Sequence, residues 1–285
     1  MLDPFTTPRS VRMVATDLDG TIIPHGQGIS TRTRAALDAC TTAGMRVVFV
    51  TGRPPRWLAP VVEVTHHLGF AICANGSITL DLETDAVVSL HSITNEVATE
   101  VALRLRAVVP DVVFAVETPS GMSVERGYEK ARGPGPASVL TSPPVGALRE
   151  APMLEQLLDD EPVIKLVAIS PRSTPDALLT AGRRLVADLV TPTHSSPTVA
   201  LLEMGPSGVT KGSSLEELAR SWGIAAADVV SFGDMPNDIE MLQWSGTSFA
   251  MSGGHPDAIS AADHLAPFAD DDGVAQVLEC ILRRR

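Results

Sequence analysis

The sequence predicts an α/β protein in which a doubly wound, Rossmann-like parallel sheet carries an inserted α+β domain. Short β-branched runs alternate with helical stretches near both ends of the 285-residue chain, which is typical of a parallel sheet. Between these ends the sequence changes to strands accompanied by two long amphipathic helices. We therefore expect a core formed by residues 1–83 and 205–285 and an inserted domain formed by residues 84–204.

The N-terminal part of the core has a βαβαβ pattern. Ser30 is of the type that caps a helix N-terminus, and Gly44 is of the type that ends a helix. The uninterrupted apolar run Val47-Val48-Phe49-Val50 suits a strand of a parallel sheet that is covered on both faces. The expected elements are strands at 11–16, 46–50 and 70–74 and helices at 31–43 and 57–68.

The other elements follow from the same periodicities. In the C-terminal part of the core we expect helices at 213–222, 236–244 and 273–280 and strands at 229–232 and 248–251. In the inserted domain we expect strands at 87–93, 112–116, 122–126, 163–169 and 198–204, and helices at 94–109 and 174–189. Residues 132–146 are rich in Pro and Gly and predict a loop.

The composition of the chain restricts the kinds of partner that the protein can bind. There are 34 acidic and 22 basic residues, a net charge of −12, which argues against a nucleic-acid-binding surface. Polar residues interrupt every apolar run before the roughly 18 residues that a membrane span needs. Because the N-terminus has no pattern of a secretory signal or lipid anchor, we expect a cytoplasmic protein that acts on a small ligand. Nothing in the sequence indicates an oligomeric state.

Unusual polar groups follow the predicted core strands. In open parallel sheets, ligands bind beyond the carboxyl ends of the strands, so these positions are the first candidates for a site. Lys211, one of only three lysines in the chain, lies just before a predicted helix. The segments are Asp17-Leu18-Asp19-Gly20-Thr21, Thr51-Gly52-Arg53, Val209-Thr210-Lys211-Gly212 and Gly233-Asp234-Met235-Pro236-Asn237-Asp238.

Such a concentration of carboxylates requires a cation. Two unit charges about 4 Å apart interact by about 4 kcal/mol at an effective dielectric constant near 20. Oxygen ligands at this density suit Mg²⁺, whereas Zn²⁺ would favour His or Cys. With the metal and Lys211 withdrawing charge, one aspartate can attack phosphorus while Thr51 and glycine N–H groups bind the phosphoryl oxygens. A second carboxylate two residues along can then handle the proton of the leaving alcohol.

In this order, the four motifs resemble those of the haloacid dehalogenase (HAD) superfamily. The resemblance is to Cof-type phosphatases (class IIB), which carry a large α/β cap, of the C2B type, after the second motif. It extends over nearly the whole chain, is weakest within the cap, and includes Ala74-Asn75-Gly76-Ser77. It implies a HAD-like core, an inserted cap and a Mg²⁺-dependent phosphatase that hydrolyses phosphate monoesters of small metabolites, such as sugar phosphates, through an aspartyl-phosphate.

The resemblance also implies roles for single residues. Asp17 would be the nucleophile and a Mg²⁺ ligand, and Asp19 would be the general acid and base and would ligate through its carbonyl. Asp234 would bind the metal, and Asp238 would ligate it or support it. Thr51, Gly52 and Lys211 would hold the phosphoryl group, Asn237 would face it, and Arg53 would contact substrate or cap or form a surface ion pair.

Some features leave alternatives open. A phosphomutase similar to phosphomannomutases, acting on hexose phosphates, has a related core and cap, and a non-catalytic binding protein could retain the fold. Where relatives commonly have Ala-Met-Gly-Asn-Ala, this chain has Ala250-Met251-Ser252-Gly253-Gly254-His255, so the contact of that loop with ligand or cap is in doubt. His66 and His67 are expected on a helix away from the motifs. Lys165 is expected to face solvent, with contact to substrate as the alternative. Gly133-x-Gly135 lacks the features of a dinucleotide loop.

Overall fold

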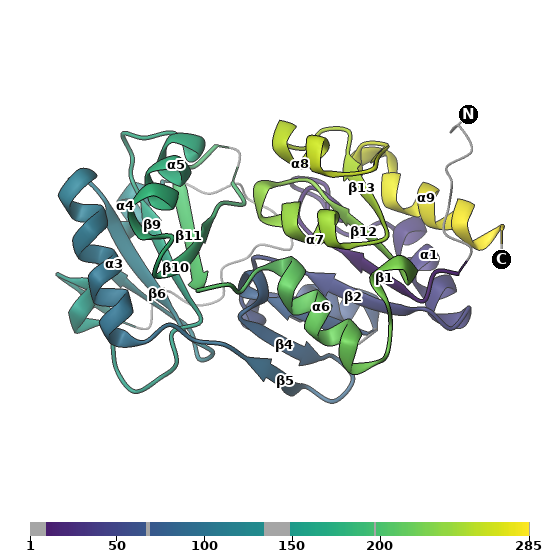
Figure 1. The fold of residues 1–285 in the computed structure, drawn as a ribbon, viewed down its shortest axis with the longest axis horizontal. Coiled ribbons are helices and arrows are strands. Elements are labelled where there is room, and N and C mark those ends of the chain that lie inside the picture. The colour runs from purple at the N-terminus through teal and green to yellow at the C-terminus, as the bar shows by residue number, and fades with distance from the viewer. Residues whose placement is uncertain (1–9, 67–68, 134–148, 197, 285) are drawn as a thin grey trace.

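The protein consists of two sheets with their helices, joined side by side (Figure 1). The structure is a computed structural model that describes residues 10–66, 69–133, 149–196 and 198–284. The eight-stranded sheet has the order β14-β13-β12-β1-β2-β3-β4-β5, and the six-stranded sheet has the order β10-β11-β9-β6-β7-β8. We call the corresponding parts the larger and the smaller unit. The predicted α/β fold is confirmed.

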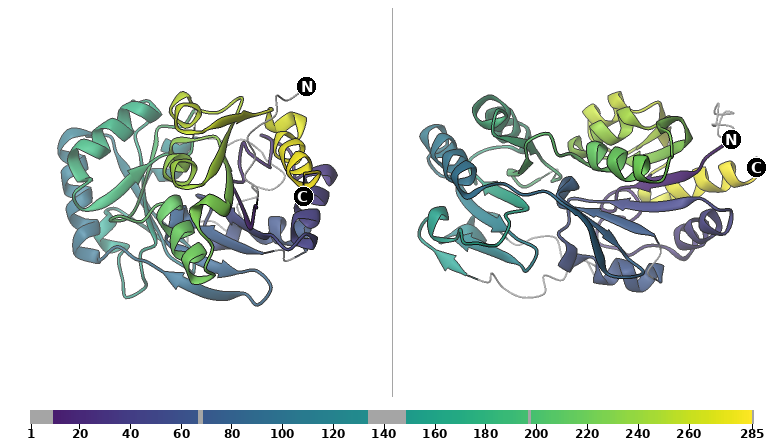
Figure 2. Two further views of the ribbon diagram at one scale, coloured as in Figure 1. Left: turned by 45° about the vertical axis from the view of Figure 1, so that its right-hand side comes forward. Right: turned by 60° about the horizontal axis from the view of Figure 1, so that its bottom comes forward.

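The larger sheet is parallel from β14 to β3 and antiparallel at β4 and β5. Successive residues of its central strands point to opposite faces, as strand geometry requires. Thus Val14 packs into the cluster that contains α1 and α9, whereas Met13 packs into the cluster that contains α6 and α7. Figure 2 shows these helices on the two faces of the sheet. Its strands are β1 (Met13–Thr16), β2 (Arg46–Val50), β3 (Phe70–Cys73), β4 (Ile78–Asp81), β5 (Ala86–Leu90), β12 (Val229–Gly233), β13 (Thr247–Met251) and β14 (His264–Ala266).

Capping residues in the sequence mark the ends of helices in the larger unit. The hydroxyl of Ser30 accepts a hydrogen bond from the backbone N–H of Thr33, and Gly44, two residues after the last helical residue, has φ +82°. Thr210 and Ser213 form a reciprocal capping box at the start of α6. The helices are α1 (Thr31–Thr42), α2 (Ala59–Thr65), α6 (Lys211–Ser221), α7 (Ile239–Trp244), α8 (Pro256–Ala261) and α9 (Gly273–Leu282).

The smaller sheet has α3 and α5 on one face, whereas its other face is turned toward the larger unit and carries only the short helix α4 among the described residues. Phe114 and Leu166 pack with α3 and α5 in one apolar cluster. The alternate residues Glu117 and Lys165, which are paired across β6 and β9, therefore point to the other face. The elements are β6 (Val113–Glu117), β7 (Met122–Glu125), β8 (Glu150–Ala151), β9 (Lys165–Ile169), β10 (Val190–Thr193), β11 (Leu201–Pro206), α3 (Asn95–Val108), α4 (Tyr128–Arg132) and α5 (Pro175–Val186).

Several sequence expectations differ from the structure. Strand β5 pairs with β4 in the larger sheet, so the expected start of the insert at residue 84 falls before the last strand of that sheet. The helix expected at 57–68 is a 3-10 turn at Pro55–Trp57 followed by α2, with Pro54 and Pro60 at the starts. Most of the loop expected at 132–146 lies outside the described residues. Among the residues that the structure covers, no helix is long and apolar enough to cross a membrane.

Candidate active site

The four motifs come together at one edge of the larger sheet. Strand β1 lies between β2 and β12 with all three parallel, so the residues that follow these strands share an edge. Asp17, Thr51 and Asp234 stand directly at those strand ends. Lys211, the first residue of α6, extends into the same place. The order β2-β1-β12 thus explains how segments about two hundred residues apart form one site.

The centre of the site is an ammonium between two carboxylates. Lys211 Nζ lies 2.5 Å from Asp17 Oδ1 and 2.7 Å from Asp238 Oδ1. All three side chains are almost completely buried. Carboxylate oxygens of Asp17, Asp234 and Asp238 lie within 4.8 Å of one another. One cation therefore faces three carboxylates in a region from which water is largely excluded.

Backbone and hydroxyl donors fix the two later carboxylates. Asp238 Oδ2 accepts hydrogen bonds from the backbone N–H groups of Asp234 and Met235, each at 3.0 Å. Thr21 Oγ1 donates to Asp234 Oδ1 at 3.0 Å. A Cβ at Gly20, where φ is +85°, would collide with the carboxylate of Asp234. The Gly20-Thr21 pair of the first motif therefore holds a carboxylate of the last motif.

Burial shapes the protonation of this cluster. It raises the pKa of Asp17 to about 7, although Lys211 opposes the shift. Burial, with the charges of Asp17 and Asp238, also raises the pKa of Asp234 well above its usual value. Burial alone would lower the pKa of Lys211, but the two carboxylates beside it raise that pKa. The ammonium remains charged at neutral pH, and the carboxylates lack a second positive charge.

The cluster fits a magnesium ion. Its donors are all oxygens, which is the ligand type that Mg²⁺ prefers. A doubly charged cation would supply the charge that Lys211 alone does not balance among Asp17, Asp234 and Asp238. The missing side chain of Gly20 leaves room for the Asp234 carboxylate, and the hydroxyl of Thr21 orients that carboxylate through its hydrogen bond.

Arg53 forms two hydrogen bonds to the carboxylate of Asp19. Its Nε lies 2.8 Å from Asp19 Oδ2 and its Nη2 lies 2.5 Å from Asp19 Oδ1. The Arg53 side chain is buried, whereas that of Asp19 is half-exposed toward the cavity. The sequence left a surface ion pair and a contact with substrate or cap equally open for Arg53. The structure shows a buried arginine that forms a bidentate pair with a motif residue.

The second motif is supported by the segment Ala74-Asn75-Gly76-Ser77. The backbone N–H of Asn75 donates to the carbonyl of Thr51 at 3.0 Å. Asn237 Nδ2 donates to Asn75 Oδ1 at 2.9 Å, while Asn237 Oδ1 is buried without a partner. The Thr51 hydroxyl accepts from the backbone N–H of Arg53 at 3.0 Å. Thr51, Gly52 and Asn237 all line the cavity described next.

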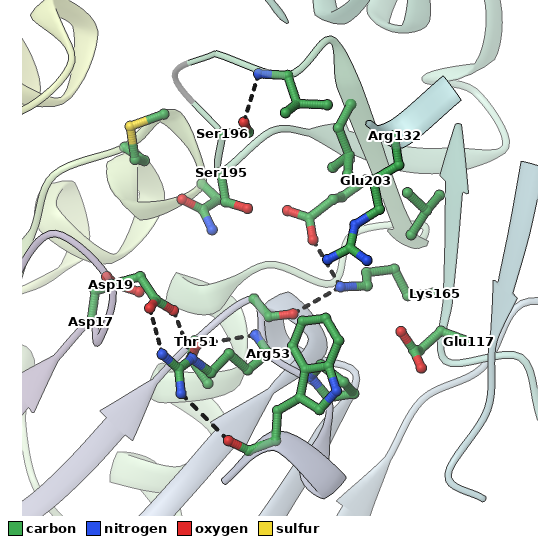
Figure 3. Close-up of a pocket in the computed structure, with 18 of the residues that line it drawn as sticks. Asp17, Asp19, Thr51, Arg53, Glu117, Arg132, Lys165, Ser195, Ser196 and Glu203 are labelled. Atoms are coloured by element: carbon green, nitrogen blue, oxygen red, sulfur yellow. Dashed lines mark hydrogen bonds and ion pairs between the residues drawn. The ribbon is translucent and has the colours of Figure 1, made fainter. Parts of the chain in front are cut away.

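A cavity of about 460 Å³ lies between the two units and has this site at one end (Figure 3). At its other end Lys165 Nζ lies 2.8 Å from Glu203 Oε1 and 2.8 Å from the carbonyl of Gly52. Lys165 is 4% exposed, so the expectation that it faces solvent is wrong. Lys165 on β9 is paired with Glu117 on β6, on the face of the smaller sheet opposite α3 and α5.

Two further acidic residues of the smaller unit were missed by sequence reasoning. Glu203 is fully buried; burial alone would raise its pKa, but Lys165 outweighs this and lowers it. Glu117 forms an ion pair with Arg56, yet burial still raises its pKa. Both residues lie in otherwise apolar strands, where a charged residue is unusual. This departure from the apolar pattern is the sequence signal that could have identified them.

Other residues singled out in the sequence lie elsewhere. His66 ends α2 and lies 3.1 Å from Arg34 Nη1, while His67 lies outside the described residues. The altered loop that includes Gly254 packs on the backbone of the carboxylate cluster: the N–H of His255 donates to the carbonyl of Asp234 at 2.7 Å. A Cβ at Gly254 would lie 2.8 Å from that carbonyl. The loop thus supports Asp234.

Comparison with known proteins agrees with this geometry. The model of the haloacid dehalogenase-like hydrolase family matches residues 14–278. YxeH of Bacillus subtilis (strain 168), which is provisionally named a phosphatase, is 25% identical over 94% of this chain and 97% of its own. The crystal structure of TM0651 from Thermotoga maritima is 26% identical, with a TM-score of 0.72 over 95% of this chain and 97% of that one. The HAD subclass IIB sugar phosphatase BT4131 shares the fold, at 20% identity and a TM-score of 0.78 over 95% and 99% of the two chains. The chain therefore belongs to the haloacid dehalogenase-like hydrolases, as the four motifs predicted.

Proposed function

We propose that this protein is a Mg²⁺-dependent phosphatase that hydrolyses monoesters of small phosphorylated metabolites through an aspartyl-phosphate on Asp17. The observation that carries the proposal is the position of Lys211, between Asp17 and Asp238 at the end of β1. A nucleophilic carboxylate beside a buried ammonium and an oxygen-only cation site is suited to phosphoryl transfer, which depends mainly on positioning and electrostatics. Family membership supports the reaction class.

In the first step, an oxygen of the Asp17 carboxylate attacks phosphorus, and the bond from phosphorus to the leaving oxygen breaks. Lys211 neutralises charge on the nucleophile before attack and on the phosphoryl oxygens afterwards. Asp19 delivers the proton that the leaving alcohol requires. Thr51 and the N–H of Gly52 would bind phosphoryl oxygens, and Asn237 lines the same cavity.

In the second step, water attacks the same phosphorus, inorganic phosphate leaves and the Asp17 carboxylate is regenerated. Asp19 accepts the proton of that water, which returns the residue to its starting state. Arg53 forms a bidentate pair with Asp19 in the present structure, so we infer that substrate binding loosens this pair and that Asp19 takes up a proton from solvent before it protonates the leaving alcohol.

Asp17, Asp234 and Asp238, together with the carbonyl of Asp19, would hold the magnesium ion. When bound, the ion withdraws negative charge from the phosphoryl group and offsets the repulsion among the carboxylates. Asp238 also keeps its hydrogen bonds from the backbone of the last motif, so it supports the site even when it does not ligate directly.

We propose that the smaller unit acts as the cap. The contact between Lys165 and the carbonyl of Gly52 joins it to the second motif. The leaving group of the substrate would occupy the cavity between the units, with Glu117 and Glu203 on its far wall. Closure would exclude water while the phosphoenzyme forms.

The test is phosphate release from p-nitrophenyl phosphate with Mg²⁺ and after EDTA, in the wild type and in Asp17→Asn. We expect turnover only in the wild type with Mg²⁺, and both proteins should keep the same circular dichroism spectrum. Turnover in Asp17→Asn would contradict the proposal. A hexose phosphate distinguishes the phosphomutase, because that enzyme would return a positional isomer instead of free phosphate.

A further inference from the structure

A second cluster of potential metal ligands lies where the two units meet. Asp176 lies in the first turn of α5, and His194 follows β10, both in the smaller unit. His255 is the N-cap residue of α8 in the larger unit. Figure 1 shows α5 and α8 on the same side of the molecule, on either side of the junction. None of the three residues lines the active-site cavity.

The three side chains converge on one point. His194 Nε2 lies 3.1 Å and His255 Nε2 lies 3.3 Å from the same oxygen, Asp176 Oδ1. The two imidazole rings are nearly perpendicular, at 81°, with centroids 5.8 Å apart. In a tetrahedral zinc site with bonds of about 2.0–2.1 Å, neighbouring ligand atoms are about 3.3 Å apart. The two separations from Asp176 Oδ1 match that spacing, and all three ligand atoms lie within 4.8 Å of one another.

The donor set selects a different ion from that of the carboxylate cluster. Two imidazoles and one carboxylate suit Zn²⁺ and related transition metals, whereas Mg²⁺ favours oxygen ligands. The Asp176 side chain is 71% exposed, which leaves a route for an ion from solvent and a position for water as fourth ligand.

The second ring nitrogen of His255, Nδ1, shows how the cluster would be held together without a metal ion. His255 Nδ1 accepts a hydrogen bond from the backbone N–H of Asp257 at 3.2 Å, which in the metal-free protein places the proton on Nε2. The two histidines would then donate to Asp176 as a purely hydrogen-bonded contact. In a metal-bound state Nδ1 would carry the proton, so it would give up the hydrogen bond from the Asp257 N–H and move toward Asp257 Oδ2, which lies 3.9 Å away. A carboxylate behind a ligating histidine is a common arrangement in metal sites.

We propose that Asp176, His194 and His255 form a transition-metal site, with Zn²⁺ as the favoured ion, that ties the smaller unit to the larger one. The site is independent of the proposed phosphatase chemistry, because it shares no residue with the carboxylate cluster. It also gives the altered loop that ends in His255 a role: His255 is the ligand that the larger unit supplies. Binding would hold the two units together and stabilise the closed arrangement.

The experiment is a titration of the whole chain with Zn²⁺ in excess Mg²⁺, followed by calorimetry. We expect one tightly bound Zn²⁺ per chain. His255→Ala and Asp176→Ala should each weaken binding by about 100-fold or more, since even outer partners of metal ligands contribute about 10–100-fold. These two side chains are more exposed than that of His194, so their replacement should leave the fold intact.

Two controls locate the ion. His91 lies 3.2 Å from Glu217 but is in neither of the potential metal-ligand clusters among the described residues, so His91→Ala should bind Zn²⁺ like the wild type. Asp234→Asn, which impairs the carboxylate cluster, should also retain Zn²⁺. Three results would overturn the proposal: loss of Zn²⁺ binding in Asp234→Asn, unchanged binding in His255→Ala, or no binding by the wild type. If the wild type binds no Zn²⁺, the three side chains form a hydrogen-bonded contact only. With Co²⁺, the wild type but not His255→Ala should give the strong visible absorption of a four-coordinate nitrogen-ligated ion.

Discussion

The ammonium of Lys211 lies 2.5 Å from Asp17, although 194 positions separate the two residues in the chain. The contact exists because α6 begins at the sheet edge where β1 ends. It brings the proposed nucleophile and its counter-charge together before any substrate binds.

Replacing Lys211 by Met should destabilise the protein at pH 8. Breaking a buried ion pair by removing one partner costs about 3–5 kcal/mol, because the remaining charge stays buried and unpaired. Here Asp17 and Asp238 would both lose their cation. Urea unfolding without divalent cations measures the loss. The double variant Lys211→Met/Asp238→Asn is the control and should recover part of the stability; if the single variant is as stable as the wild type, the pair is not as buried as described.

The stability of the metal-free protein should fall as pH rises from about 4 to about 7. Burial raises the pKa of Asp17 from 3.8 to about 7, so the native state holds a proton that the unfolded chain releases in this range. Stability from this group is full below pH 3.8 and is lost as pH rises through 7. Thermal unfolding in EDTA across this range measures the fall, and Asp17→Asn should show a shallower slope. A slope equal to that of the wild type would show that Asp17 is not the group that causes the fall in stability.

Magnesium should stabilise the protein more at pH 8 than at pH 5. The ion competes with protons for Asp17 and for Asp234, whose pKa is also raised, so binding must release protons at lower pH. Calorimetric titrations with Mg²⁺ in two buffers of different ionisation enthalpy measure that release. An affinity for Mg²⁺ that does not change between pH 5 and pH 8 would contradict the proposed ligands.

Asp19→Asn should slow turnover more for an alkyl phosphate than for p-nitrophenyl phosphate. A poor leaving group needs the proton that Asp19 supplies, whereas p-nitrophenolate leaves without it, and general acid catalysis contributes about 10²–10⁴-fold. Comparing kcat for both substrates in both proteins gives the ratio. Equal losses of kcat for the two substrates would show that Asp19 contributes to positioning or charge and not to proton transfer.

Lys165→Met should destabilise the protein by about 3–5 kcal/mol, because Glu203 would be left buried without its cation. The matched control is the double variant Lys165→Met/Glu203→Met, which removes both charges and should recover most of the stability. Unfolding in urea measures both. A single variant as stable as the wild type would show that the Glu203 carboxylate finds another partner.

The sequence predicted the strand-end motifs well because their positions follow from local patterns. Buried β-branched runs such as Val47–Val50 mark central strands, and the polar residues after them must lie at the sheet edge. Family membership is confirmed, and the geometry brings Asp17, Lys211 and Asp234 together. The roles of these residues remain predictions.

The sequence predicted less where pairing between distant segments decides the structure. Strand β5 has an exposed, apolar pattern that fits either unit, and its pairing with β4 places it in the larger sheet. Lys165 was misassigned because the partner that allows its burial, Glu203, lies on another strand. The contact between Arg53 and Asp19 joins two loops whose relative position only the folded sheet fixes.

The most direct test of the account is the stereochemical course at phosphorus. A phosphorothioate monoester made chiral with two oxygen isotopes would be hydrolysed in water that carries the third isotope, and the configuration of the released thiophosphate would be determined. Two in-line displacements, first by Asp17 and then by water, predict overall retention of configuration. Inversion would show that water attacks the ester directly, and it would contradict a phosphoenzyme on Asp17.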